Sequence, residues 1–237
     1  MIRHHFELRE TITTILADKQ EHIDAAVGGI IRARQAVERC IARDPFFGAT
    51  FDPYIPDSDE PVIMRMASAG ARAGVGPMAA VAGAIAWAGL EAMREAGASF
   101  GVVDNGGDIA LSTDREILIG IHAGSSAWSD RLAFNVPPTG GILGICTSSA
   151  TVGPSISFGV ADSVTIFSRD VALADAWATA ICNEVREDDT SVFLRTDPGE
   201  VSGIFVVIGD WTARHGQLPP LVPARPGSAL ITRGYRP

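Results

Sequence analysis

Asp175 and Thr179 are the residues whose types and spacing point most directly to chemistry. They lie in the segment ADAWATA, residues 174–180, and positions four apart on a helix share one face. A carboxylate and a hydroxyl on one face are hard oxygen donors of the kind that Mg²⁺ takes in proteins. The spacing therefore predicts a metal site, although an exposed aspartate beside a threonine that bonds the preceding turn explains the same pattern.

The segment VDNGGDIAL, residues 103–111, interrupts a strand pattern with Asn105, Gly106, Gly107 and Asp108. Asn-Gly between apolar runs is typical of a tight hairpin turn. Two glycines beside a carboxylate also let the backbone approach a flat ring or a phosphate closely. Both interpretations stay open, and under the second a larger side chain at Gly107 is expected to weaken ligand binding more than folding.

Hydroxyl side chains follow the apolar start of GICTSSATVG, residues 144–153, where Thr147, Ser148 and Ser149 come directly after Cys146. Hydroxyls and free amides at a strand end can hold an anion, but hydroxyls that satisfy a turn are the simpler explanation. No neighbouring base or pKa-lowering group accompanies Cys146 in the sequence, so no nucleophile is assigned. The catalytic residues stay unassigned.

A Gly-Pro turn opens the Ala-rich segment GVGPMAAVAGA, residues 74–84. Gly76, Pro77 and Met78 stand where a helix N-terminus could receive an anionic ligand. Tight packing of small residues explains the same composition. His122 follows a predicted strand near these segments, and a lone histidine is more often structural than catalytic.

Hydrophobic periodicity predicts the elements that must position these residues. Helices are predicted at 21–43, at 61–95 with a break near 74–77, and at 172–185. Strands are predicted at 6–16, 100–103, 109–111, 117–121, 132–136, 142–146, 163–167 and 204–208. A loop is predicted over 44–61, and an irregular tail from Pro219 onwards. The partial segregation of helices and strands favours an α+β fold whose middle strands form an antiparallel meander.

The composition excludes several classes of partner. Of the 237 residues, 28 are acidic and 19 are basic, and a net charge of −9 without any basic tract makes nucleic acid an unexpected partner. A hydrophobic fraction of 46% and a mean hydropathy of +0.19 supply a large core. We treat residues 1–237 as a single domain.

Membrane and disulfide signals are weak. The uncharged run 73–90 is mostly Ala and Gly and contains Pro77, so we interpret it as a buried helix rather than a membrane span. The three cysteines are odd in number and far apart, which argues against a disulfide framework, and the polar N-terminus does not read as a signal peptide. A cytoplasmic protein without a membrane partner is expected.

Five segments, taken in order, resemble a known family: GVGPMAAVAGAIA, VDNGGDIAL, ILIGIHAG, GICTSSATVGPSISFGVADSVTI and LADAWATAI. The series spans residues 61–185 and is similar to that of an uncharacterised prokaryotic family within the superfamily of FAD:protein FMN transferases, the ApbE-like proteins. The resemblance implies a T-fold-like α+β architecture, with antiparallel sheets packed against helices. An internal duplication stays open.

The resemblance also implies ligands. Asp175 and Thr179 match the Mg²⁺-binding carboxylate and threonine of the transferases, with the Ala178 carbonyl as a neighbour, and residues 105–108 match the turn that lines their flavin site. Mg²⁺ and FAD or FMN are thus the implied cofactors, since a divalent cation stabilises the charge that develops when a pyrophosphate is split. A nucleotide or flavin-like small molecule is the implied partner, and a homo-oligomer stays open.

The chain departs from the transferase pattern in two places. The lysine and aspartate expected at the helix start are absent, Pro77 and Met78 stand in that stretch, and Lys19 is the one lysine in the sequence. The histidine segment of the transferases is replaced by residues 155–166, with Asp162 in its vicinity. The pocket could therefore persist while the reaction has changed.

Two hypotheses follow. The first is a Mg-dependent enzyme, FMN transferase-like, that acts on a flavin or related nucleotide. The second is a non-catalytic binding protein for a flavin- or pterin-like small molecule that has lost FMN transferase activity. If transfer persists, we expect Arg65, Arg72 or His122 to replace the missing charge.

Overall fold

A large antiparallel sheet forms the centre of the molecule. The computed structural model describes residues 1–151 and 159–224, and the account below concerns these residues. The sheet has eight strands in the order β1-β2-β3-β4-β7-β8-β9-β10, and neighbouring strands are antiparallel throughout. The strands are β1 (Ile2–Leu8), β2 (Thr11–Ala17), β3 (Gly101–Asn105), β4 (Asp108–Ser112), β7 (Leu143–Ser148), β8 (Ser163–Ser168), β9 (Val201–Ile208) and β10 (Trp211–Gly216).

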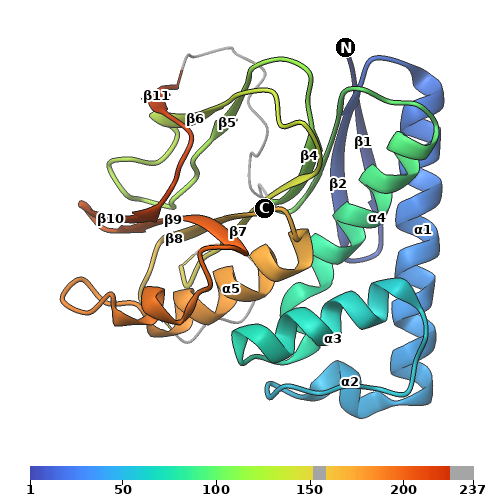
Figure 1. Cartoon of the computed structure of the whole chain (residues 1–237), viewed down its shortest axis with the longest axis horizontal. Coiled ribbons are helices and arrows are strands. Elements are labelled where there is room, and N and C mark those ends of the chain that lie inside the picture. The colour runs from blue at the N-terminus through green and yellow to red at the C-terminus, as the bar shows by residue number, and fades with distance from the viewer. Residues whose placement is uncertain (152–158, 225–237) are drawn as a thin grey trace.

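Helices cover one face of this sheet, and a three-stranded sheet covers part of the other (Figure 1). The helical segments are α1 (Gln20–Arg43), α2 (Pro45–Ala49), α3 (Pro61–Ala73), η1 (Pro77–Ala80), α4 (Val81–Glu95), α5 (Val171–Glu184) and η2 (Ser191–Arg195). The small sheet contains β11 (Leu221–Pro223), β6 (Leu132–Val136) and β5 (Ile117–Gly120), in that order. One hydrophobic core lies between the large sheet and the helices, and a second lies between the two sheets.

The large sheet consists of two halves with the same connectivity. In the first half, the hairpin β1–β2 leads through α1 to α4 into the hairpin β3–β4, and in the second, β7–β8 leads through α5 into β9–β10. Strand order follows chain order in both halves, and β4 pairs with β7 at the centre. This arrangement confirms the expected α+β architecture and matches an internal duplication.

Small residues allow the helices to pack closely. A Cβ on Gly29 of α1 would lie 2.6 Å from the Ala88 carbonyl oxygen of α4. The uncharged run 73–90 crosses the turn after α3 and forms η1 and most of α4, so its small side chains fill helix contacts. Among the described residues no single helix has the length and apolar character to cross a membrane, and the one pair that qualifies together, Pro61–Ala73 with Pro77–Glu95, is bent by 108°.

The helices follow the sequence predictions, but several strands require correction. The strand predicted over 6–16 is the β1–β2 hairpin, because the chain turns at Arg9, which adopts a φ of 55° without glycine. The middle strands are not one meander, since β5 and β6 leave the large sheet and pair in the small one.

Further differences concern short elements. The helix α2 lies inside the predicted loop 44–61, and β10 and β11 lie where no strand is predicted. β11 has three residues and ends in Pro, and β10 has a largely polar sequence, WTARHG, that ends in Gly, so neither strand carries a strong apolar period. The remainder of the predicted tail, residues 225–237, lies outside the described residues.

Candidate functional site

Asp175 lies at the junction of the two halves of the molecule. It projects from α5, is 7% exposed, and its Oδ2 accepts a 2.8 Å hydrogen bond from the backbone N–H of Gly83 in the first turn of α4. A Cβ on Gly83 would lie 2.8 Å from both Asp175 Cβ and the Val171 carbonyl oxygen. The close approach of α4 and α5 therefore requires glycine at position 83.

The first turn of α4 uses its free N–H groups on this carboxylate. Burial raises the pKa of Asp175 to about 7, although the N–H groups of Gly83 and Ala82 partly offset the rise. The predicted role of this helix N-terminus, reception of an anionic ligand, is thus taken at least in part by a carboxylate of the protein itself.

The β3–β4 turn lies directly beside α4. Asn105 Nδ2 donates to the Ala82 carbonyl oxygen at 3.1 Å, and the N–H of Gly107 donates to Asp104 Oδ1 at 2.9 Å. Gly106 and Gly107 have φ values of 71° and 107°, the left-handed conformations of a tight two-residue turn. Both glycines therefore suit the hairpin, and a valine at Gly107 would be strained at this φ. Its relative effect on binding and on folding stays a prediction.

Asp108 follows the same turn, and one of its carboxylate oxygens, Oδ1, is buried without a hydrogen bond among the described residues. Burial raises the pKa of Asp108 well above its ordinary value, the Asp175 and Asp104 carboxylates raise it further, and hydrogen bonding by the Thr147 backbone and the Cys146 side chain offsets this only in part. Two carboxylates, Asp108 and Asp175, thus lie in one poorly solvated region with unresolved repulsion.

Cys146 faces this region from β7, where it pairs with Asp108 across the sheet. Its thiol donates to the Val171 carbonyl oxygen at 3.5 Å. Burial, followed by the charges of Asp108 and Asp175, raises the pKa of the thiol well above its usual range. A thiolate nucleophile is therefore disfavoured at this position.

Of the predicted hydroxyl residues, Thr147 and Ser148 lie in β7 and Ser149 lies just after it. Thr147 and Thr165 share a hydrogen bond of 3.0 Å between their hydroxyls, and Ser148 is buried. Ser149 Oγ accepts the Thr151 N–H at 3.1 Å, as in an ordinary hydroxyl-bonded turn. Thr147 reaches the acidic region through its backbone, and residues 152–158 of this motif lie outside the described residues.

The Gly-Pro segment at the start of η1 serves packing. A Cβ on Gly76 would lie 2.0 Å from the Thr50 carbonyl oxygen, Pro77 is buried, and Met78 packs against the helical core. Nothing in these contacts gives Gly76, Pro77 or Met78 a direct part in the acidic site.

Thr179 lies one turn beyond Asp175 on α5 and is half-buried. Its helical spacing from Asp175 is as predicted. Within residues 1–151 and 159–224, no group of three His, Cys, Asp or Glu side chains is arranged to hold a metal ion. The metal site therefore rests on Asp175, Thr179 and the neighbouring Asp108, and remains a prediction.

The cations that could replace the missing lysine are engaged elsewhere. Arg65 forms two hydrogen bonds with Glu91, at 2.7 and 2.8 Å, and its guanidinium lies over the Trp87 ring. Arg72 pairs with Asp170 and Glu200.

The third candidate, His122, also lies beside a carboxylate, and so does the one lysine of the sequence. His122 Nδ1 lies 3.4 Å from Asp130 Oδ1, and Lys19 lies 2.9 Å from Glu21. Within the described part of the chain, the contacts of Arg65, Arg72 and His122 are thus made with carboxylates other than Asp175.

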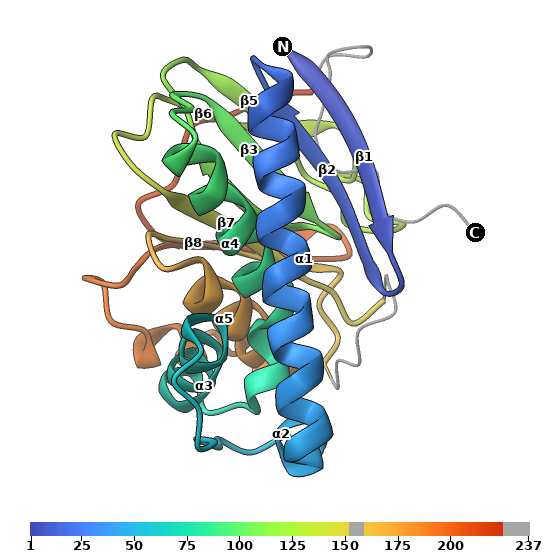
Figure 2. The ribbon, with the colours of Figure 1, turned by 90° about the vertical axis from the view of Figure 1, so that its right-hand side faces the viewer.

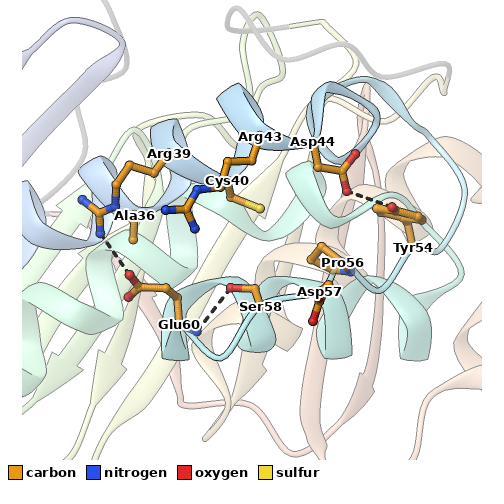
Figure 3. A pocket seen from close by; sticks show the side chains of 10 residues that line it. All are labelled: Ala36, Arg39, Cys40, Arg43, Asp44, Tyr54, Pro56, Asp57, Ser58 and Glu60. Carbon is orange, nitrogen blue, oxygen red and sulfur yellow. Dashed lines mark hydrogen bonds and ion pairs between the residues drawn. The ribbon is translucent and has the colours of Figure 1, made fainter.

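Two concave pockets occur away from the acidic site. One, of about 280 Å³, lies between the end of α1 and the loop before α3, where Arg39 pairs with Glu60 at 3.0 Å and Tyr54 donates to Asp44 at 2.8 Å (Figure 3). The other, of about 320 Å³, is lined by residues such as Ser112 and Pro138. Neither pocket includes Asp108 or Asp175.

Two positioning residues were missed by the sequence interpretation. Asp104 accepts the Gly107 N–H. An aspartate three residues before the N–H that it accepts is typical of a side chain that bonds a following turn. Gly83 holds Asp175, but a single glycine among alanines carries no sequence signal for such a contact.

The architecture is that of the ApbE-type flavin transferases. The apo structure of the flavinyl transferase ApbE from Pseudomonas stutzeri is similar with a TM-score of 0.60 at 11% identity, covering 90% of this chain and 93% of that one. The flavin transferase ApbE from Vibrio cholerae gives a TM-score of 0.52 at 13% identity, with 90% and 96% coverage. These identities show a shared fold.

The chain belongs to the family described as AbpE bacteria, whose model matches residues 2–201. It is 59% identical over 237 residues to a UPF0280 protein of Methanoregula boonei, with both chains fully covered. It is 63% identical over 234 residues to a UPF0280 protein of Methanoculleus marisnigri, covering 99% of this chain and 96% of that one. The family resemblance seen in the five segments is confirmed.

Proposed function

We propose that this protein binds a flavin or a related nucleotide together with Mg²⁺, and that Asp175 and Thr179 hold the cation next to the β3–β4 turn. The observation that carries the proposal is the buried, unpartnered Oδ1 of Asp108 near the buried Asp175 carboxylate. A divalent cation is the partner that removes such repulsion without a new basic side chain. The ApbE-type fold supports the ligand class.

The donor set suits Mg²⁺ rather than a softer metal. It consists of carboxylate and hydroxyl oxygens, and Mg²⁺ typically takes one or two carboxylates and keeps several waters. Cys146 is a poor competitor, because its thiol is bonded to Val171 and its pKa is raised. Bound here, Mg²⁺ would supply positive charge for the phosphates of a nucleotide.

The chain's own residues have separate tasks in this proposal. Gly83 fixes Oδ2 of Asp175, and we place the cation on the other carboxylate oxygen. Asp104 and Asn105 fix the β3–β4 turn from both sides, so that the peptide groups of Gly106 and Gly107 can face a planar ring. Because a Cβ on Gly106 would meet no atom within 4 Å, this surface of the turn is open.

Binding without efficient FMN transfer is the form of the proposal that the contacts favour. Each lost electrostatic contact to a transition state lowers the rate by about 10²- to 10³-fold. Arg65 and Arg72 are held in ion pairs, and Lys19 lies in a surface pair with Glu21. The competing proposal, a Mg-dependent transferase, is favoured only by the retained Asp175 and Thr179.

Metal-dependent stability tests the cation site. Thermal denaturation with Mg²⁺ or Mn²⁺ should show a gain of about 2.7 kcal/mol at a cation concentration near 100 times Kd. Asp175→Ala should abolish the gain, whereas Asp210→Ala, at an exposed aspartate of the β9–β10 turn, should retain it. An equal response in the Asp175 variant would rule out the site.

Flavin binding and transfer separate the two hypotheses. Titration with FAD and FMN in the presence of Mg²⁺ should give saturable binding that weakens in Asp175→Ala. Incubation with FAD, Mg²⁺ and a threonine-containing acceptor protein should leave the acceptor without covalent flavin fluorescence on a denaturing gel. Strong labelling that disappears in Asp175→Ala would establish a transferase instead.

Mass spectrometry of small molecules that copurify with the protein would narrow the ligand class. A flavin or a pterin-like heterocycle is expected, and a ligand without a ring would contradict the role given to the β3–β4 turn. Within the described residues the three cysteines form no disulfide, and we also propose a cytoplasmic, reducing location.

A further inference from the structure

The strand β1 forms one edge of the large sheet. It pairs with β2 on one side, and no described element pairs with its other side. Figure 2 shows β1 at the margin of the molecule, outside β2 and α1. An exposed edge of seven residues is a template for pairing with another strand unless the protein blocks it.

The backbone groups that point outward belong to three residues. Leu8 and Thr11 close a two-residue turn, so they form a hydrogen-bonded pair, and such pairs alternate along an antiparallel ladder. The even-numbered residues of β1 therefore bond to β2, and Arg3, His5 and Glu7 direct their N–H and carbonyl groups away from the sheet. These three side chains are also exposed.

We propose that two copies of this chain pair through β1 in an antiparallel, two-fold symmetric ladder centred on His5. His5 is the midpoint of Ile2–Leu8, so this register overlaps the entire strand. It sets Arg3 of each copy opposite Glu7 of the other, on the same face of the joined sheet. The proposal is independent of the ligand proposed above.

The remaining pairs fit the same register. Ile2 faces Leu8 of the other copy and His4 faces Phe6, on the face where Ile2 and Phe6 already pack against the helical core. Isologous pairing of this kind closes the assembly at two copies. The occupant of the edge is therefore a second copy of this chain.

Charge complementarity favours this register over those centred on Arg3 or on Glu7. Charged side chains on an edge strand commonly prevent pairing. Here the opposite charges lie at equal distances from the midpoint, so a shift that centres the ladder on Arg3 or on Glu7 sets like charges opposite each other. Within the described residues Arg3 has no ion-pair partner, while Glu7 contacts His5 of its own strand at 2.9 Å.

The other edge of the sheet lacks this pattern. β10, with the sequence WTARHG, contains no acidic residue, so self-pairing sets no carboxylate opposite Arg214. β10 therefore provides an internal control for charge changes at a sheet edge.

Charge reversal tests the register. Sedimentation velocity of the full chain in the micromolar range should show a dimer. Arg3→Glu and Glu7→Arg should each weaken the dimer by about tenfold to a hundredfold, because two attractive pairs become repulsive. A mixture of these two variants should form a heterodimer, and the double variant Arg3→Glu/Glu7→Arg should recover the homodimer. Arg214→Glu should have no effect.

A backbone variant tests the edge without relying on charge. His5→Pro removes an outward N–H that β2 does not use, so it should abolish the dimer while circular dichroism shows an unchanged fold. A monomeric wild type, a dimer that survives His5→Pro, larger open assemblies, or a mixture of the charge variants that stays monomeric would each overturn the proposal.

Discussion

The β3–β4 and β9–β10 turns occupy equivalent positions in the two halves of the large sheet, but their surroundings differ. The β9–β10 turn is bound on several sides: the Gly209 N–H donates to Asp162 Oδ2 at 2.7 Å, and the loop after β5 donates to the carbonyls of Gly209 and Asp210 through Ser126 and Trp128. The β3–β4 turn is held through Asp104 and Asn105, and its glycines stay open on the outer side.

The difference shows how one scaffold produces a structural turn and a candidate binding turn. In the second half, Asp162 uses both oxygens on neighbouring groups, the Thr151 hydroxyl and the Gly209 N–H. In the first half, Asp108 keeps a buried oxygen without a partner. A carboxylate with satisfied oxygens stabilises the fold, whereas one with an unsatisfied buried oxygen is stabilised by an added ligand.

The largest expected effect comes from adding a side chain at Gly83, where α4 and α5 are in close contact. Gly83→Ala places a Cβ 2.8 Å from Asp175 Cβ and from the Val171 carbonyl, and should lower the free energy of unfolding by about 1–3 kcal/mol. It should also remove the Mg²⁺-induced stabilisation, because Asp175 must move. Chemical denaturation with and without Mg²⁺ measures both effects.

Gly28→Ala is the matched control for this helix substitution. A Cβ there would meet only the mobile end of Arg32, at 3.2 Å, so the variant should gain up to about 1 kcal/mol and respond to Mg²⁺ like the wild type. Equal behaviour of the two variants would contradict the positioning role of Gly83.

Neutralisation of Asp108 and of Asp162 should change the stability of the protein in opposite directions. Asp108→Asn should stabilise the metal-free protein by about 1 kcal/mol at neutral pH, since asparagine avoids the cost of either keeping a proton on Asp108 or burying its charge. Asp162→Asn should destabilise it by about 1 kcal/mol, since charge-assisted bonds to Thr151 and Gly209 weaken. Thermal denaturation in the presence of a chelator measures both effects. A gain in stability in both variants would contradict the proposed difference between Asp108 and Asp162.

The Asp108→Asn effect should depend on pH. The raised folded-state pKa of Asp108 means that the folded protein retains a proton that the unfolded chain releases. The wild type therefore loses stability as pH rises from the ordinary carboxyl pKa through the raised value, and the advantage of the asparagine variant should grow over that interval. A constant difference across pH would exclude titration of Asp108.

The smallest expected effect on stability concerns the turn glycines. Gly106 and Gly209 have φ values of 71° and 55°, and a Cβ on either meets no atom within 4 Å. Because asparagine tolerates this conformation, Gly106→Asn and Gly209→Asn should each change stability by less than about 1 kcal/mol. Flavin affinity should fall in the first variant only; an equal affinity in both would remove the β3–β4 turn from the binding surface.

The sequence predicted the fold best where periodicity extends over many residues. The apolar spacing of α1 and the break at Gly74 were predicted because helix period and glycine chemistry are local properties. The β1–β2 turn at Arg9 was missed because its conformation is imposed by the hairpin rather than by a turn residue. The partner choice of β5 and β6 depends on contacts distant in sequence.

The candidate site was predicted as separate segments, and the structure joins part of them. The Asn105–Asp108 turn, Cys146–Thr147 and Asp175 come together because β3–β4, β7 and α5 are neighbours in the duplicated architecture. Gly76 and Ser149 were grouped with them on composition; Gly76 packs against Thr50 and Ser149 accepts the Thr151 N–H, and their part in a binding site stays a prediction. Composition identifies small and polar residues without distinguishing these uses.

The burial of Cys146 opposite Asp108 gives access to the opening kinetics of the site. Alkylating reagents react with the thiolate form of cysteine. The Cys146 thiol is buried, donates to the Val171 carbonyl, and has a pKa above its usual range. It therefore reacts when α5 separates from β7. The half-buried Cys40 on α1 lies outside this contact and provides an internal reference. The ratio of the two labelling rates therefore measures how often α5 separates from β7 beside the acidic site.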